Sequence, residues 1–299
     1  MSSAMRSPSK AFTALLLTAL IAAPAVAPTT SSAAEAPLVV SGYSDDRVDS
    51  GWGLFSFCGD DLRAMLSDTS NFGAGGVVER PISLASPGVD AVTPGSLDGV
   101  DVFFTGWVET STYTADERAA LLDFVLGGGA VIATTDGTDH NIADLFGLTL
   151  TDSNYTSATP VAPASPLING PFGTVTTITF SGDQGIYTGL GAASVIAEAD
   201  PSLGPAVALL PPGALGPGSG PVVLVADVDV FSTADENCVD GPGMGAVANS
   251  VFVRNVFAYL ANLSETPTTT TTSQPVESST TTTTTGATSV PRATPRFTG

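Results

Sequence analysis

Two short runs of this sequence are apolar at every position, and they constrain the fold more than any other feature. Ala130–Ala133 and Val222–Ala226 contain only Ala, Val, Ile and Leu. A strand without a polar face must be covered on both sides, as the strands of a parallel sheet are when helices pack on both of its faces. The sequence therefore predicts a layered α/β fold.

The segment before the first run predicts the helix that such a fold requires. Thr114 stands three residues before Glu117, which is the pattern of a capping box, and apolar residues then follow at helical spacing. Gly127–Gly129 ends the helix, because glycine adopts the left-handed conformation at little cost. A helix followed directly by a buried strand is the repeating unit of a doubly wound sheet.

The same alternation continues through residues 35–263. Further strands are predicted at Leu38–Gly42, Val77–Leu84 and Val100–Phe104, and further helices at Gly53–Leu66, Ile142–Phe146 and Val247–Leu263. Residues 152–220 are rich in Pro and Gly, so we expect a β-rich insertion or a β-rich sheet edge there. Its strand-like pieces are Val175–Phe180, Ser194–Ala197 and Ala206–Leu210. The predicted fold class is α/β, a doubly wound, mostly parallel sheet with helices on both faces.

Both ends of the chain differ in composition from the region between them. Arg6 and Lys10 precede an apolar run, Ala11–Ala23, which is too short to span the ~30 Å core of a bilayer and is typical of a secretory signal. We expect residues 1–34 to be a signal peptide that is removed, with an uncut membrane anchor as the alternative. Residues 264–299 are mostly Thr, Ser and Pro and are predicted to form a disordered stalk. The mature protein is thus expected to be secreted or exposed on the cell surface, without membrane insertion.

The charge of the chain excludes one class of partner. The formal net charge is −20, with 29 Asp plus Glu against 9 Lys plus Arg. Binding to nucleic acid needs a basic surface, and this chain has none, so nucleic acid is not an expected partner. A surface rich in Asp and poor in Lys also suits a salty medium, where screening weakens the repulsion between like charges.

The sequence contains two cysteines, Cys58 and Cys238. An oxidising compartment outside the cell permits a disulfide between them, but the bridge requires that the two residues lie close together in the fold. Two buried thiols are the alternative. The sequence alone leaves both states open.

Three stretches occur in an order that is known from one superfamily. Asp101-Val-Phe-Phe-Thr-Gly is followed by Thr114–Ile132, and the strand and acidic turn at Val222–Asp229 precede an aromatic helix at Asn249–Leu263. This order resembles the class I glutamine amidotransferase-like superfamily, above all its ThuA-like and gliding-protein-like branches. The resemblance spans residues 38–263 and implies a flavodoxin-like fold rather than a particular function.

The residues of the amidotransferase reaction are missing at the matching positions. In catalytic members a cysteine stands on the sharp turn after the strand that matches Ala130–Ala133, with a histidine and a glutamate further along. Here Thr135 occupies the nucleophile position, and the only histidine, His140, lies directly after the turn. Without a thiolate and its base, glutamine hydrolysis by the family mechanism is excluded, and the resemblance is to non-catalytic members.

Open α/β sheets bind ligands beyond the carboxyl ends of their strands, and several residues suited to a site follow predicted strands. The candidate ligand-binding residues are Asp45, Asp46, Trp107, Asp136, His140, Asp227 and Asp229. Their neighbours with similar side chains are Tyr43, Ser44, Trp52, Thr105, Glu109, Thr135 and Asp139. With the predicted topology, carboxylates and one or two indoles share one rim of the sheet.

Three functions fit such a rim. The first is non-catalytic binding of a carbohydrate or another cell-surface polymer, in which Trp107 or Trp52 offers a flat apolar face and carboxylates accept hydrogen bonds. The second is a Ca²⁺ site of Asp136, Asp227 and Asp229, which lacks the later glycine and glutamate of an EF-hand loop. The third is a hydrolase that uses two carboxylates, or Thr135 with His140, as acid and base.

A purely structural role for these residues is the remaining alternative, because aspartates after strands cap helices and tryptophans complete cores. Among the functions, we expect binding rather than catalysis, and Ca²⁺ is the one cofactor that the residue types suit.

Overall fold

The two apolar runs form adjacent strands at the centre of the sheet. In the computed structural model, which describes residues 35–182, 184–199, 203–238 and 241–263, they are β4 (Ala130–Thr134) and β13 (Val222–Val225). The two strands pair in parallel, and every residue of both is buried. The predicted signal peptide and stalk lie outside the described residues.

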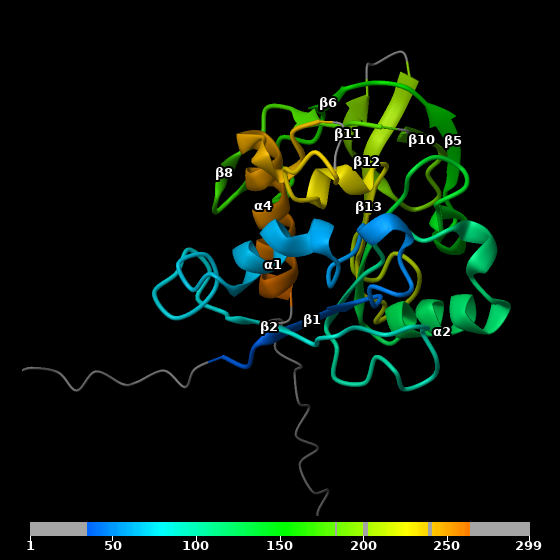
Figure 1. Cartoon of the computed structure of the whole chain (residues 1–299), viewed down its shortest axis with the longest axis horizontal. Coiled ribbons are helices and arrows are strands. Elements are labelled where there is room, and N and C mark those ends of the chain that lie inside the picture. The colour runs from blue at the N-terminus through cyan, green and yellow to red at the C-terminus, as the bar shows by residue number, and fades with distance from the viewer. Residues whose placement is uncertain (1–34, 183, 200–202, 239–240, 264–299) are drawn as a thin grey trace, which may run out of the picture.

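A nine-stranded sheet surrounds this pair, in the order β2-β1-β3-β4-β13-β12-β11-β6-β9 (Figure 1). The pairings from β2 to β13 are parallel, and those from β13 through β12, β11 and β6 to β9 are antiparallel. The other strands of this sheet are β1 (Leu38–Gly42), β2 (Ile82–Leu84), β3 (Val102–Phe104), β6 (Ser157–Pro160), β9 (Ile178–Thr179), β11 (Ser194–Ala199) and β12 (Gly204–Leu210). The mostly parallel, doubly wound sheet is confirmed, and the β-rich region supplies its antiparallel edge.

Two short pairs of strands lie outside this sheet. β5 (Thr149–Ser153) pairs with β10 (Gln184–Gly189), and β7 (Asn169–Gly170) pairs with β8 (Gly173–Thr174). Leu150 of β5 and Tyr187 of β10 are buried in the same apolar cluster as Leu210 of β12. The β5–β10 pair therefore extends the core beside the central sheet.

Helices cover both faces of the sheet, as predicted. α1 (Asp60–Ser67) and α4 (Val247–Leu263) pack on one face, and α2 (Ala115–Leu126) packs on the other. The Thr114 hydroxyl accepts a hydrogen bond from the Glu117 amide at 3.1 Å, so the predicted cap of α2 is formed. The short 3₁₀ helices are η1 (Asp49–Gly51), η2 (Phe57–Gly59), η3 (Thr110–Thr112), η4 (Ala143–Phe146), η5 (Val228–Phe231) and η6 (Gly243–Gly245).

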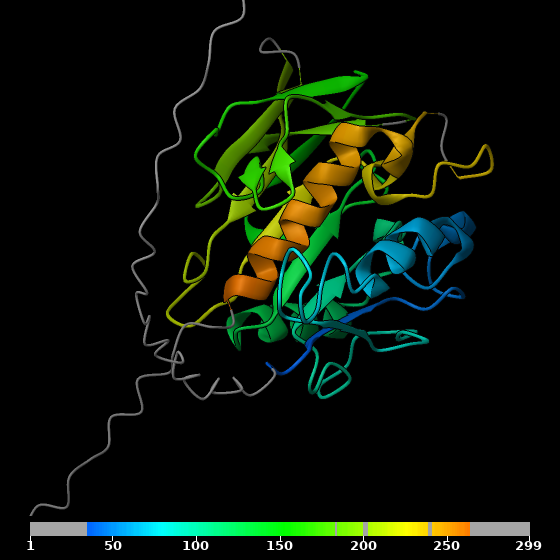
Figure 2. The same ribbon diagram turned by 90° about the vertical axis from the view of Figure 1, so that its left-hand side faces the viewer.

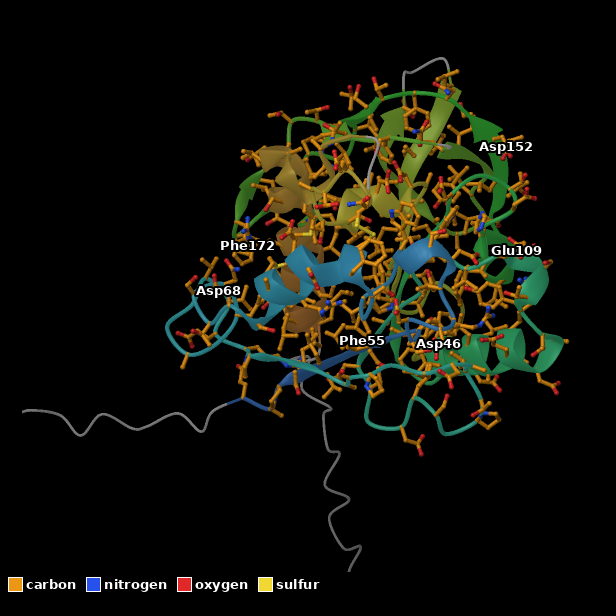
Figure 3. All side chains as sticks on the ribbon, in the orientation of Figure 1. Asp46, Phe55, Asp68, Glu109, Asp152 and Phe172 are labelled. Atoms are coloured by element: carbon orange, nitrogen blue, oxygen red, sulfur yellow. A yellow bond between two sulfur atoms is a disulfide. The ribbon has the colours of Figure 1, made fainter. Side chains whose placement is uncertain are left out.

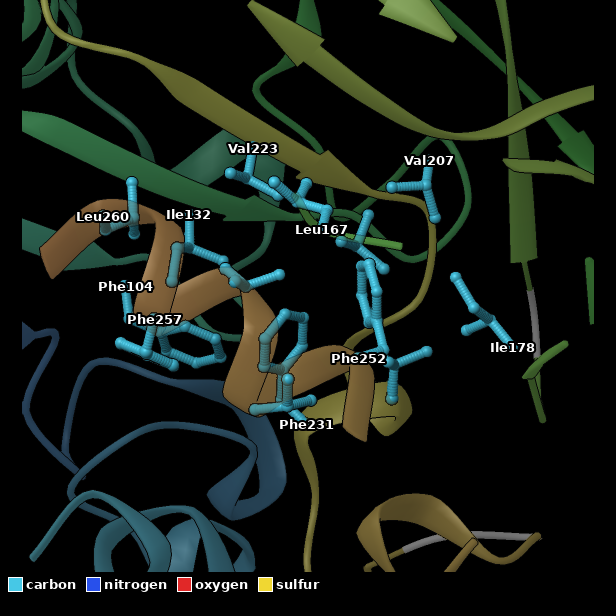
Figure 4. Close-up of a cluster of buried hydrophobic side chains, with 14 of the residues drawn as sticks. Phe104, Ile132, Leu167, Ile178, Val207, Val223, Phe231, Phe252, Phe257 and Leu260 are labelled. Atoms are coloured by element: carbon cyan, nitrogen blue, oxygen red, sulfur yellow. The ribbon is translucent and has the colours of Figure 1, made fainter. Parts of the chain in front are cut away.

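The apolar side chains of the strands alternate between two clusters, because successive residues of a strand point to opposite faces. Ile132 and Val223 pack with α1 and α4, whereas Val131 and Leu224 pack with α2. Figures 2 and 4 show α4 along its face of the sheet, with Phe257 near the strand residues. Within the described ranges, no helix combines the length and the apolar composition that crossing a bilayer requires.

Several predicted elements are shorter than expected, among them β3 and β9, and glycines or a local pairing account for β2, α1 and η4. Val78 pairs with Phe72 across a glycine-rich turn, so β2 begins only at Ile82. Gly59 lies against the backbone of Gly53 and Leu54, where a Cβ would clash, so the helix predicted from Gly53 begins as α1 only at Asp60. The helix predicted at Ile142–Phe146 forms as a single 3₁₀ turn, η4, which the left-handed Gly147 directly after it, with φ of 80°, prevents from continuing.

Arg80 joins the two ends of the described domain. Its Nε donates to the carbonyl oxygen of Ala36 at 2.9 Å, and its Nη1 donates to that of Ala261 in the last turn of α4 at 3.0 Å. Asp101 lies 3.5 Å from the same guanidinium. Both ends consequently lie at the edge where the parallel strands begin (Figures 1 and 2).

Candidate functional site

A pocket of about 340 Å³ lies at the opposite edge, beyond the carboxyl ends of β3 and β4. We refer to it as the rim pocket, and its lining residues are Trp107, Asp136, Gly137, Thr138, Asp139, His140, Asp152, Ser153 and Gln184. Its position is the one at which open α/β sheets bind ligands. It brings together three of the residues that the sequence predicts, Trp107, Asp136 and His140.

The turn after β4 forms the floor of the rim pocket. The Asp136 amide donates to the His140 carbonyl oxygen at 2.8 Å, and Gly137 between them is left-handed, with φ of 63°. Thr138 then fixes this turn to β5, because its amide and hydroxyl donate to the Asp152 carboxylate at 2.6 and 3.1 Å. A turn held at both ends presents its side chains to the pocket in one arrangement.

Aromatic side chains form one wall of the pocket. The Trp107 indole stacks on the His140 imidazole, with ring centroids 4.2 Å apart, and meets the Trp52 indole edge-on at 4.9 Å. His140 Nε2 lies 3.3 Å from Asp49 Oδ2, which holds the imidazole in place. The Trp107 indole N–H is buried and has no acceptor among the described residues. Because His140 covers one face of Trp107, that indole does not offer the open flat face that the sequence suggests.

Trp52 connects this wall to the disulfide. Cys58 in η2 and Cys238 are bridged, with their Cα atoms 5.3 Å apart, and the Trp52 indole N–H donates to the Cys238 carbonyl oxygen. Of the two states that the sequence leaves open, the structure contains the disulfide. The bridge thereby supports the loop after β1, from which Trp52 projects.

Asp227 and Asp229 lie behind the pocket rather than in its wall. Asp227 is fully buried, and its carboxylate accepts hydrogen bonds from the amides of Ser181 and Asp229 at 2.8 and 2.7 Å. Burial, and then the negative charges of Asp229 and Asp136, raise the pKa of Asp227 well above its ordinary value. Asp229 accepts a hydrogen bond from the Ser181 hydroxyl at 2.6 Å. The two aspartates thus anchor the β9–β10 connection to the end of β13.

These carboxylates bear on the predicted Ca²⁺ site. Asp136, Asp227 and Asp229 are close enough for their charges to interact. Within the part of the chain that the structure describes, however, no group of three or more His, Cys, Asp or Glu residues is arranged to hold a metal ion. Both oxygens of Asp227 already accept backbone hydrogen bonds. The Ca²⁺ site stays a prediction from sequence, and no chemistry is derived from it.

Asp45 and Asp46 are exposed on the turn after β1 and do not line the rim pocket. Figure 3 shows Asp46 well apart from Asp152. The space at the end of β1 is filled instead by a buried network, in which the Tyr43 hydroxyl donates to Glu117 Oε1 at 2.8 Å and Arg47 lies 3.2 Å from Glu117 Oε2. The ligand position that the fold offers between β1 and β3 is therefore occupied by protein side chains.

Thr135, at the nucleophile position of the superfamily, faces the interior. Its hydroxyl lies 3.2 Å from the Tyr187 hydroxyl and 3.4 Å from the carbonyl oxygen of Val225. Thr135 is buried and is not among the residues that line the pocket. Neither the Thr135 hydroxyl nor the His140 ring, which stacks on Trp107, is placed to act on the other.

Five residues of the pocket wall were not predicted as site residues: Gly137, Thr138, Asp152, Ser153 and Gln184. Ser153 and Gln184 are register partners in the antiparallel β5–β10 pair, which places both beside the turn after β4. Nothing in the sequence signals a pairing between segments that lie so far apart along the chain. Thr138, by contrast, belongs to the same turn as Asp136. Because that turn follows a predicted strand, its position could have identified Thr138 as a site residue.

A larger cavity, of about 820 Å³, lies at the edge where the strands begin. Glycine backbone forms much of its wall, at Gly127–Gly129 and Gly218–Gly220, together with apolar residues such as Leu260. Its carboxylates include Asp101, which is already bound to the Val39 amide at 2.8 Å and lies close to Arg80. The rim pocket has the richer set of polar side chains and the edge of the sheet that suits a site.

Comparisons with known proteins bear on the fold. No protein-family model matches the sequence, and no curated protein matches it. Among solved structures, the mmIFT52 N-terminal domain matches with a TM-score of 0.52 at 15% sequence identity, over 75% of this chain and 97% of that one. A putative ThuA-like protein from Bacteroides uniformis gives a TM-score of 0.47 at 11% identity, over 77% and 94% of the two chains.

A β-galactosidase from Rahnella sp. matches with a TM-score of 0.47 at 15% identity, over 77% of this chain and 31% of that one. At these identities the matches concern the arrangement of the backbone alone. That arrangement, a parallel core in the order β2-β1-β3-β4-β13 with helices on both faces, is the one that the sequence resemblance implies. The chain has the class I glutamine amidotransferase-like fold.

Proposed function

We propose that this protein is an exported, non-catalytic binding protein that holds a carbohydrate segment of a cell-surface polymer in the rim pocket. The observation that carries the proposal is the composition of the pocket wall, in which an indole stands beside carboxylates, hydroxyl groups and an amide within about 340 Å³. That volume falls within the ~300–1,000 Å³ of small-molecule sites. Sugars present apolar ring faces and many hydroxyl groups, which such a wall matches.

Several polar groups in the wall are available to a ligand. The side chains of Asp139 and Ser153 make no hydrogen bond to another described residue, whereas Asp152 is bound by Thr138, and Gln184 by the Tyr155 amide and the Gly182 carbonyl oxygen. The Trp107 indole lines the same pocket and adds apolar surface beside these polar groups. A carboxylate, a hydroxyl group and an apolar ring around a common space are sufficient to orient a sugar ring.

A hydrolase is less well supported by the same geometry. Asp227, whose raised pKa would suit a general acid, is fully buried and cannot reach a bound substrate. The Thr135 hydroxyl is also buried, and its partners are Tyr187 and Val225. Catalysis would have to depend on carboxylates of the pocket wall, such as Asp136 and Asp139.

Export is supported by the predicted signal peptide and by the Cys58–Cys238 disulfide, because such bridges persist in oxidising compartments. The rim pocket lies at the edge opposite to Leu263, the last described residue before the Thr-rich segment. A stalk attached at Leu263 would present the pocket away from the point of attachment.

The test is a glycan array probed with the exported protein, followed by calorimetry with the ligand found. Asp139→Ala, which removes an acceptor, and Ser153→Tyr, which fills the pocket, should each weaken binding by about tenfold or more. Asp46→Ala is the matched control, because that carboxylate is exposed and lies outside the pocket. Binding that Ser153→Tyr leaves intact would contradict the proposal, and turnover of a glycoside that Asp136→Ala abolishes would favour the hydrolase.

A further inference from the structure

A groove follows the edge where the strands begin, on the side opposite to the rim pocket. The cavity of about 820 Å³ described above adjoins a smaller one of about 230 Å³, since Leu97, Asp98, Asp123 and Phe124 line both. We refer to the two cavities together as the edge groove. It reaches from the loop before β3 to Leu263 at the end of α4. Its larger cavity alone is near the upper end of the ~300–1,000 Å³ of small-molecule sites, so the groove has room for several residues of a peptide.

The wall of the edge groove combines apolar and acidic groups. Apolar side chains and glycine backbone form most of it, and the ring of Phe124 is half-buried there. Asp98 and Asp123 are exposed, and their carboxylates make no hydrogen bond or ion pair with another described residue. No Lys, Arg or His is among the described residues that line either cavity. Such a wall suits a segment that contains both proline and arginine, because proline packs on aromatic rings and guanidinium groups pair with carboxylates.

One segment of the chain has this composition. Residues 290–297 contain two prolines, two arginines and a phenylalanine, and they contain no acidic residue. The arginines of the described residues already have partners: Arg47 is paired with Glu117, Arg63 with Asp60, Arg80 with Asp101 and Arg118 with Asp144, and Arg254 donates to the Ser250 hydroxyl. Arg292 and Arg296 are thus the cations of residues 35–299 that remain to pair with the acidic domain.

The edge groove also lies where this segment is tethered. Leu263, the last described residue before it, is itself part of the groove wall. A flexible chain of the length that joins residue 263 to residue 290 has an average end-to-end distance of about 30 Å. A ligand on such a tether has an effective concentration of about a millimolar, so that even a weak contact is formed most of the time.

We propose that residues 290–297 bind in the edge groove of their own domain. The prolines pack against the apolar wall and Phe124, and Arg292 and Arg296 pair with Asp98 and Asp123. Proline has a fixed φ and loses little conformational entropy on binding, which favours such a segment over others in the same tether. The contact closes the chain after α4 into a loop at the edge opposite to the rim pocket, and it is independent of any ligand there.

Trypsin tests this contact, because it cleaves after arginine and the contact shields Arg292. The rate of cleavage after Arg292 in the exported protein is compared, by mass spectrometry, with the rate in a synthetic peptide of residues 286–299. A bound segment is cleaved only while it is detached, so the rate in the protein should be at least about fivefold lower than in the peptide. Added salt should reduce this protection, because it screens the charge pairs.

Two pairs of substitutions locate the contact. Asp98→Asn with Asp123→Asn should bring the rate to within about twofold of the peptide, because the arginines lose their partners. Asp46→Asn with Asp116→Asn removes two exposed carboxylates outside the groove and should leave the protection unchanged. Thermal melting of both variants checks that the domain is folded.

The remaining outcomes would overturn the proposal. Equal rates in the wild-type protein and the peptide would show that the segment is not bound. Protection that persists without Asp98 and Asp123 would place the segment on another surface. Equal loss of protection in both pairs of variants would show attraction to the acidic domain as a whole. Protection that falls as the protein is diluted would show that the segment binds a second copy instead of its own domain.

Discussion

Asp227 illustrates how a single buried carboxyl group makes stability depend on pH. Its pKa in the folded protein is raised, first by burial and then by the charges of Asp229 and Asp136. The folded protein therefore holds the proton more tightly than the unfolded chain does. The resulting stabilisation is complete below the unfolded pKa of about 3.9 and is lost as the pH rises through the raised pKa of the folded protein.

We expect Asp227→Asn to remove this dependence, because asparagine does not ionise. The difference in free energy of unfolding between wild type and variant should fall as the pH rises, by up to about 1.4 kcal/mol per pH unit for one proton. Urea unfolding from about pH 4 to neutral pH measures the slope. Asparagine also loses the acceptor for the Ser181 amide, which is a constant cost, so only the slope is diagnostic. Parallel profiles for the two proteins would contradict the prediction.

Glu117 is a second buried carboxylate, but it has a cation as partner. It accepts from the Tyr43 hydroxyl and the Val92 amide, at 2.8 and 3.3 Å, and lies 3.2 Å from Arg47. Glu117→Gln keeps an acceptor for Tyr43 but removes the charge that faces Arg47. The free energy of unfolding should fall by about 2–3 kcal/mol in urea titrations. The matched variant Glu79→Gln, at an exposed position, should change it by less than about 0.5 kcal/mol.

Among the elements, the disulfide makes the longest connection in sequence. Cys58 and Cys238 are 180 residues apart, and their bridge joins η2 to the segment before η6. Closing so long a loop restricts the unfolded chain strongly, so the Cys58→Ala, Cys238→Ala double variant should lose about 3–5 kcal/mol of stability. Urea unfolding of the variant and of the wild type, with and without reductant, measures this loss. Reductant should shift the wild type toward the variant and leave the variant itself unchanged.

Elements with local signals could be predicted from the sequence. α2 has its N-cap at Thr114, α4 has the bounds that its apolar spacing predicts, and β4 and β13 contain the uninterrupted apolar runs. Elements that depend on tertiary pairing could not be predicted in this way. β2 begins later than predicted because Val78 pairs locally, and the β5–β10 pair depends on a register between segments that are distant in the sequence.

Some residues of the candidate site could likewise be predicted from the sequence, and others could not. The turn after β4 and the position of Trp107 follow from the strand ends, so Asp136, His140 and Trp107 could be placed together from sequence. Asp45 and Asp46 also follow a strand, but the side chain of Tyr43 and its network fill the space there. Asp227 follows its strand as predicted, but its carboxylate oxygens accept hydrogen bonds from backbone amides. No spacing in the sequence reveals these hydrogen bonds.

At the scale of the whole molecule, the net charge of −20 predicts that salt stabilises the fold. Like charges on a compact surface repel one another, and salt shortens the range of this repulsion to about 10 Å at 0.1 M. Raising NaCl from a few millimolar should increase the melting temperature by several degrees, since about 1 kcal/mol corresponds to about 2–4 °C for a domain of this size. The increase should level off once the charges are screened. A melting temperature that does not change with salt would contradict this expectation.

The positions of Arg80 and of the rim pocket have a mechanical consequence. Arg80 donates hydrogen bonds to the backbone carbonyl oxygens of Ala36 and Ala261. The same side chain therefore connects the segment before the first strand to the last helix, at the edge where the strands begin. A ligand bound in the rim pocket, as proposed above, would pull at the opposite edge. Tension between the ligand and a tether attached after Leu263 would then run along the strands of the parallel core. Such a load shears many hydrogen bonds of the ladder together instead of opening them one by one.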